Sequence, residues 1–189
     1  ETEKESAAIL LLDMKKEHFE VYFEEYPEKN YREVAKGIAQ QASQRFTVPA
    51  FLIGTSHAAA DGEEVLQGIA EVAGPAVNAY GGAAGDDYSF TGTYVFTNGR
   101  DSGHGIVCIA LDESKVKIKG IATCGWKAVG TEKVVTKSEG NHVYTVDNIP
   151  VLDITAKYGG LENVTPENNN LLIEIAANFP LQLQREKGD

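Results

Sequence analysis

The chain has 189 residues, of which 42% are hydrophobic and 24% are charged, as is ordinary for a folded globular protein. This length is enough for one domain with a proper core and short for two independent ones. The 28 acidic and 17 basic side chains give a net charge of −11, a field that repels phosphate backbones and anionic lipid surfaces, so nucleic acid and membrane partners are disfavoured.

The N-terminal part predicts a strand and a helix. Residues 7–12 form an apolar run that stops at Asp13, which is typical of a fully buried strand. The run is far shorter than the roughly 20 residues that a membrane span needs. Apolar residues then recur at helical spacing from Tyr31 to Ala42 and predict a surface helix.

A parallel strand–helix–strand unit is predicted from about residue 50 to 80. Residues 49–54 are an apolar run typical of a buried strand, and residues 76–79 are a second, shorter one. Between them, Asp61 and Glu64 have the spacing of a capping box, and Gly74-Pro75 ends the helix. Crossovers of this kind join parallel strands.

A polar loop with three glycines and two aspartates follows the second of these strands. Gly81, Gly82 and Gly85 permit close backbone approach, and Asp86 and Asp87 supply carboxylates. Ligands bind at the carboxyl ends of strands in open α/β sheets, so we expect a ligand here. The alternative is a structural loop whose carboxylates accept its own backbone amides.

After residue 93 the pattern changes to short runs separated by turn residues, which predicts an antiparallel meander. Asn98-Gly99 is a strong hairpin signal within it. The predicted strands are residues 93–97, 105–111, 115–122, 133–138 and 142–146. Two helices are predicted at the end, one after Pro150 and one after Thr165-Pro166. The predicted fold class is α+β, in which the parallel unit and the meander share one core and helices cover the sheet.

The two cysteines, Cys108 and Cys124, lie in strand-like runs without a C-x-x-C or Cys/His cluster. A structural zinc site is therefore unsupported. Such sparse usage favours buried free thiols in a reducing compartment, which suggests the cytoplasm.

Several motifs follow one another in a recognisable order and spacing. The motifs are His57 with residues 58–64, residues 80–87, residues 90–93 with Val95-Phe96, residues 125–130, residues 135–141 and residues 149–152. In this order they resemble the N-terminal half of FIST domains, a sensory module of intracellular signal-transduction proteins. The resemblance covers about residues 50 to 160, and residues 179–181 are similar to the entry into the C-terminal half of that family.

The resemblance implies a cytoplasmic, non-catalytic input domain that binds small molecules such as amino acids. We expect one domain over residues 1–180, followed by a polar tail, residues 181–189, where a C-terminal half would begin. The expected partners are that C-terminal half and a downstream signalling output domain. We also expect an exposed apolar patch near residues 171–175 or 179–181, through which the chain self-associates.

Thr91 and Trp126 complete the set of expected ligand-binding residues, although a lone tryptophan is more often a packed core aromatic. No cofactor is expected. The alternatives are a haem-binding nitric-oxide sensor, as the resemblance implies for some members, with His57 as the best-placed ligand, and a protein-interaction scaffold. Catalysis is disfavoured because Asp86 and Asp87 are adjacent, so in a strand their side chains point to opposite faces.

Overall fold

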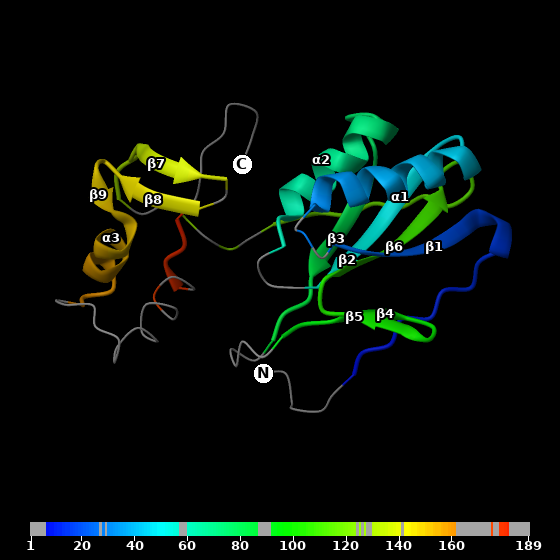
Figure 1. The fold of residues 1–189 in the computed structure, drawn as a ribbon, viewed down its shortest axis with the longest axis horizontal. Helices are drawn as coiled ribbons and strands as arrows, with labels where there is room; N and C mark the ends of the chain where they lie inside the picture. Colours follow the sequence, from blue (N-terminus) through cyan, green and yellow to red (C-terminus); the bar gives the residue numbers. More distant parts are fainter. Residues whose placement is uncertain are drawn as a thin grey trace. The chain divides into compact units, whose positions relative to one another are not determined.

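The computed structural model describes residues 7–26, 28, 30–56, 60–86, 92–123, 125, 127, 130–140, 142–161, 175 and 178–181. The chain divides into two compact units, Glu1–Ala122 and Thr123–Asp189 (Figure 1). That both units act as one sensory domain over residues 1–180 stays a prediction.

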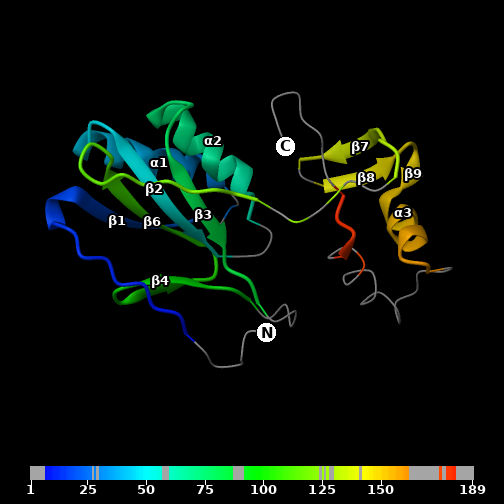
Figure 2. The same ribbon diagram turned by 180° about the vertical axis from the view of Figure 1, so that it is seen from behind.

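The first unit is a mixed sheet covered on one face by two helices. Figures 1 and 2 show α1 and α2 together on that face of the sheet. Its strand order is β1-β6-β2-β3, in which β2 and β3 are parallel and β6 is antiparallel to both of its neighbours. The elements are the 3-10 helix η1 (Lys16–His18), β1 (Phe19–Glu25), α1 (Tyr31–Arg45), β2 (Pro49–Thr55), α2 (Gly62–Ala73), β3 (Ala79–Ala83), β4 (Val95–Thr97), β5 (Arg100–Ser102) and β6 (Gly105–Asp112). The predicted α+β class and the parallel strand–helix–strand unit are confirmed. The second strand of that unit is Ala79–Ala83 rather than residues 76–79, so Gly81 and Gly82 lie in β3 and not in the loop that was predicted to hold them.

Helix α2 begins and ends where its local sequence predicts. The Asp61 side chain accepts hydrogen bonds from the backbone N–H groups of Glu63 (3.0 Å) and Glu64 (3.2 Å), which satisfies two of the donors that a helix start leaves unpaired. Gly74 ends the helix with a φ of +96°, a conformation that glycine adopts without steric cost.

The core lies between the sheet and the two helices. Small residues on α1 allow it to approach the neighbouring elements closely, and Ala35, Ala39 and Ala42 are buried. From the sheet, Phe51 of β2 and Ile106 of β6 are buried in the same cluster. Gly68 of α2 contacts the backbone of α1 so closely that a Cβ there would meet the Arg32 carbonyl oxygen.

The hairpin of β4 and β5 packs against the opposite face of the sheet. Its turn is Asn98-Gly99, as predicted, and Gly99 has a φ of +77°. Val95 lies against Gly54 of β2. Arg100 stacks its guanidinium over the Phe23 ring at 4.5 Å, an attraction between a cation and the negative face of the ring.

Two predicted strands are wrong. Residues 7–12 have no strand conformation, and Ile9, Leu10 and Leu11 are 82%, 81% and 88% exposed. The apolar side chains of this run favour burial, but they do not provide a partner strand, and among the described strands β1 pairs only with β6. Residues 115–122 also form no strand, because a turn after Asp112 takes the chain out of the sheet.

The second unit contains β7 (Val135–Glu139), β8 (His142–Val146), β9 (Ile149–Pro150) and α3 (Val151–Tyr158). Its strands form an antiparallel sheet in the order β7-β8-β9. The turn between β8 and β9 places Asp147 and Asn148 at positive φ. The Asp147 carboxylate accepts from the Val134 N–H and from Lys133, and these two groups, in that order, lower its pKa.

Apart from residues 115–122, the antiparallel strands predicted after residue 93 are present, but they belong to three sheets. The second predicted C-terminal helix falls largely outside the described residues. Phe179 and Leu181 are 58% and 54% exposed, and the apolar patch and self-association expected there stay predictions. No helix among the described residues is long and apolar enough to cross a membrane.

Glycine substitutions in the two helices test the close approach of α2 to α1. We expect Gly68→Ala to lower the free energy of unfolding by about 1–3 kcal/mol, since the added methyl group has no room. Gly37→Ala on α1 is the matched control, because a Cβ there enters open space and should stabilise the helix by up to about 1 kcal/mol. Urea unfolding followed by circular dichroism measures both. Equal stability of the two variants would contradict the packing.

Candidate functional site

Three strand ends and two helix starts meet at one edge of the main sheet. Because β6 is antiparallel to both β1 and β2, β1 runs parallel to β2 and β3. All three therefore end at the same edge, where α1 and α2 begin (Figure 1). We call it the carboxyl edge and define it by Tyr26, Ser56, residues 84–86 and the start of β6.

Ser56 and Tyr26 hold this edge together through buried hydrogen bonds. The Ser56 N–H donates to the Gly105 carbonyl at 3.0 Å, and the Gly105 N–H donates to the Ser56 hydroxyl oxygen at 2.7 Å. The Ser56 carbonyl instead accepts from the Tyr26 hydroxyl. The side chain of Ser56 thus extends the β2–β6 ladder by one residue and frees its carbonyl for Tyr26.

The phenols at this edge have raised pKa values and are uncharged at neutral pH. Burial raises the pKa of Tyr26, and the side chain of Ser56 partly lowers it. Burial, followed by electrostatic interactions with Tyr26 and Asp61, raises the pKa of Tyr31. The rings of Tyr26 and Tyr31 meet edge to face with centroids 4.7 Å apart, a favourable aromatic geometry.

The three glycines expected to bind a ligand have different surroundings. A Cβ at Gly81 would collide with the Ile53 carbonyl oxygen of β2, whereas a Cβ at Gly82 or Gly85 would enter open space. Gly81 is thus required for the pairing of β2 with β3. The loop is tied to β2 by the Ala84 N–H, which donates to the Thr55 carbonyl at 2.8 Å.

Asp86 is exposed at the end of this loop. The structure therefore brings Gly82, Gly85 and Asp86 to the carboxyl edge. The other expected site residues, Asp87, Thr91, Trp126 and the alternative haem ligand His57, lie outside the described residues.

A comparison with protein-family models identifies the chain. The model of the FIST N domain matches residues 2–149. The chain belongs to the FIST N domain family. This family is a signal-transduction sensory domain, and the match includes all of the carboxyl edge. No curated protein and no solved structure matches the chain.

Sequence patterns missed the polar groups that shape this edge of the FIST N domain. Ser56 gave one signal, as a polar residue directly after a buried strand. Tyr26 gave none, because its partner Ser56 is 30 residues away in the chain. Within the described residues no group of three or more His, Cys, Asp and Glu side chains could hold a metal ion.

Removing the Ser56 hydroxyl tests the network. We expect Ser56→Ala to lower the free energy of unfolding by about 1–3 kcal/mol, because the Gly105 N–H then lacks its acceptor in a buried position. Ser43→Ala on the exposed face of α1 is the control and should change stability by less than about 0.5 kcal/mol. Thermal or urea unfolding gives both values. If Ser56→Ala is as stable as Ser43→Ala, the hydroxyl does not support the edge.

Proposed function

We propose that this FIST N domain is a cytoplasmic, non-catalytic input domain that binds a small molecule, such as an amino acid, at the carboxyl edge. The observation that carries the proposal is the meeting of three parallel strand ends and two helix starts at this edge. Loops at such an edge can vary while the sheet holds them in place, which is why open α/β sheets bind ligands there.

The backbone of the glycine loop supports ligand approach. Gly82, Gly85 and Asp86 are exposed, and a Cβ at Gly82 or Gly85 would enter open space, so a ligand can approach this part of the backbone from outside the sheet. The hydrogen bond from Ala84 to Thr55 fixes the start of this loop on β2. A ligand can therefore reach a backbone that is already positioned, which reduces the entropy cost of binding.

The charges suit a zwitterion. Asp86 is exposed and can accept a charge-assisted hydrogen bond from an ammonium group. Helix α1 begins at the same edge without a side-chain cap, so its first N–H groups favour a carboxylate. An α-amino acid carries both of these groups. We extend the same proposal to Asp87 because of its position in the sequence alone.

Binding is favoured over catalysis because the hydroxyl groups of Tyr26 and Ser56 at this edge are engaged in structural hydrogen bonds. The haem alternative needs an axial ligand, and its candidate, His57, lies outside the described residues. We propose that the ligand signal passes to a FIST C-terminal half and an output domain. The cytoplasmic placement rests on the sparse cysteine content.

Binding to a panel of the twenty L-amino acids tests the proposal. We expect at least one to raise the melting temperature of the wild-type chain. For that amino acid, Asp86→Asn should weaken binding by roughly tenfold or more in calorimetry, which corresponds to about 1.4 kcal/mol. Gly82→Ala should also weaken binding, because its methyl group occupies the space open to the ligand.

Asp101→Asn provides the matched control, since Asp101 is an exposed aspartate on β5 and should bind as the wild type does. A panel without any binder would contradict the choice of amino acids. Equal loss of affinity in Asp86→Asn and Asp101→Asn would place the site elsewhere. A Soret band after haem addition would favour the haem alternative.

A further inference from the structure

Strand β1 has one partner strand and one free edge within the described residues. The Tyr26 N–H donates to the His104 carbonyl, which places the even-numbered residues of β1 in the hydrogen-bonded pairs with β6. The N–H and C=O groups of Phe19, Val21 and Phe23 therefore point away from β6. Among the described residues, the Phe23 carbonyl has a partner on that side, the Arg100 guanidinium at 3.4 Å.

An open groove of about 610 Å³ follows this free edge. It is lined by Glu20, Val21 and Tyr22 from β1 and by Gln41, Gln44 and Arg45 from α1. The last turns of α1 thus cover one side of the space that an added strand would occupy. A peptide that pairs with β1 would meet side chains as well as backbone groups, which is how added strands gain specificity.

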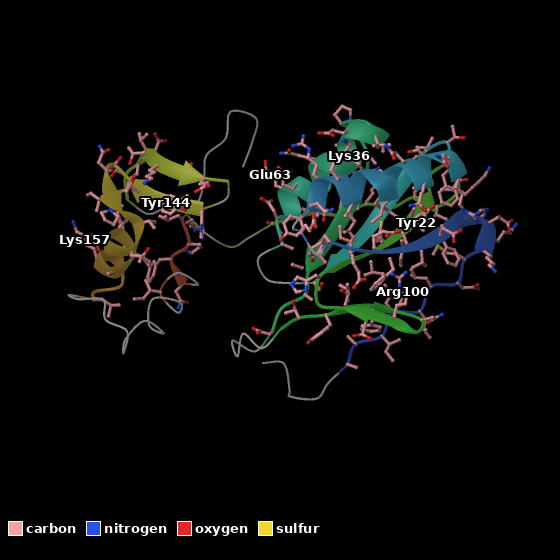
Figure 3. All side chains as sticks on the ribbon, in the orientation of Figure 1. Tyr22, Lys36, Glu63, Arg100, Tyr144 and Lys157 are labelled. Carbon is pink, nitrogen blue, oxygen red and sulfur yellow. The ribbon has the colours of Figure 1, made fainter. Side chains whose placement is uncertain are left out.

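The two faces of β1 differ in character. Glu20, Tyr22 and Glu24 alternate on the face toward α1, and Phe19, Val21 and Phe23 lie on the other face, where Arg100 reaches Phe23. Figure 3 shows Tyr22 and Arg100 on these two sides. The charge on the α1 face is mixed, because Arg45 pairs with Glu20 at 3.1 Å, but Glu24 adds a second carboxylate. A matching strand needs cationic and apolar side chains in alternation.

One segment of the chain has this alternation. Residues 115–119 read Lys-Val-Lys-Ile-Lys, and we call them the lysine segment. The structure leaves this segment outside every sheet, with its lysines exposed. When this segment is centred on the middle of β1, in either strand direction, its first and last lysines lie opposite Glu20 and Glu24. Val116 and Ile118 then lie on the apolar face of β1.

Two other occupants fit less well. In the antiparallel register that sets Tyr22 opposite itself, a second β1 would set Glu20 against Glu24, and like charges opposite each other destabilise a strand pair. Residues 7–12 are exposed, but all six are apolar. Half of their side chains would face Glu20, Gln41 and Gln44.

We propose that the lysine segment of a second copy pairs with the free edge of β1 and extends the main sheet across two copies. The edge and the segment are different surfaces of the same unit, Glu1–Ala122. The contact is therefore head to tail, and each copy added leaves one edge and one segment for the next. Association then grows with concentration and weakens with salt, because lysine–glutamate attraction at a partly exposed edge is screened.

Charge reversal in both partners tests the pairing. Sedimentation velocity from micromolar to millimolar chain concentration should give an average mass above that of a monomer for the wild type. Lys115→Glu/Lys119→Glu and Glu20→Lys/Glu24→Lys should each weaken self-association at least tenfold. An equimolar mixture of these two variants should associate again, since each restores the charge match of the other.

Val21→Pro tests the backbone part without changing charge. Its N–H points to the free edge, so proline removes a donor for the added strand and leaves the β6 ladder intact. It should reduce association, whereas Leu10→Ser/Leu11→Ser in the exposed apolar run should not. Circular dichroism of every variant checks that it folds. The association of the mixed charge-reversal variants is compared only with that of each variant alone, once both are shown to be folded.

A synthetic peptide of residues 114–122 distinguishes the occupants. It should bind the monomeric Lys115→Glu/Lys119→Glu variant, whose β1 is unchanged, and a scrambled peptide of the same composition should not. A wild-type chain that stays monomeric at millimolar concentration overturns the proposal, even if the peptide binds, because the edge would then serve a basic strand of another protein. Association that survives both charge reversals, or that fails to return in the mixture, overturns it as well.

Discussion

The insertion of β6 between β1 and β2 is the constraint on which the first unit depends. Strand β6 pairs along its full length with both neighbours, and Ile106, Cys108, Ala110 and Leu111 are buried. These pairs join residues about 50 to 90 positions apart in the chain. Bringing such distant segments together costs loop-closure entropy before hydrogen bonds and buried area stabilise the sheet. The sheet therefore forms cooperatively.

The same insertion creates the carboxyl edge. If β6 were absent, β1 and β2 would have no common neighbour to fix their direction. With β6 between them, Tyr26 at the end of β1 and Ser56 at the end of β2 lie on either side of the start of β6. Each of them makes hydrogen bonds to the chain at the start of β6, and the Tyr26 hydroxyl also donates to the Ser56 carbonyl. The fold and the candidate site therefore rest on one set of hydrogen bonds. The glycine loop depends on it indirectly, because among the described strands β3 pairs only with β2.

The sequence predicted the features whose causes lie within a few residues. The Asp61 cap, the Gly74 terminus and the Asn98-Gly99 turn are local chemistry, and all three are confirmed. The partners of a strand are set by distant segments, which explains why residues 7–12 were wrongly predicted to be in a sheet. In the site, composition indicated that glycines matter. It could not distinguish Gly81, where the Ile53 carbonyl leaves no room for a side chain, from Gly82, where a side chain would enter open space.

The position of Cys108 limits how this domain can receive a signal. Its thiol lies on the central strand, nearly inaccessible, and burial raises its pKa to about 12. Oxidation and metal binding require the thiolate, whose fraction at neutral pH is then negligible. Cys108 therefore packs as a small apolar residue and does not act as a redox input. Reaching it would require opening the β6 ladders, and with them the carboxyl edge. Among the described residues, a signal can enter this unit most readily by non-covalent contact at its exposed edges, where backbone groups are accessible without unfolding.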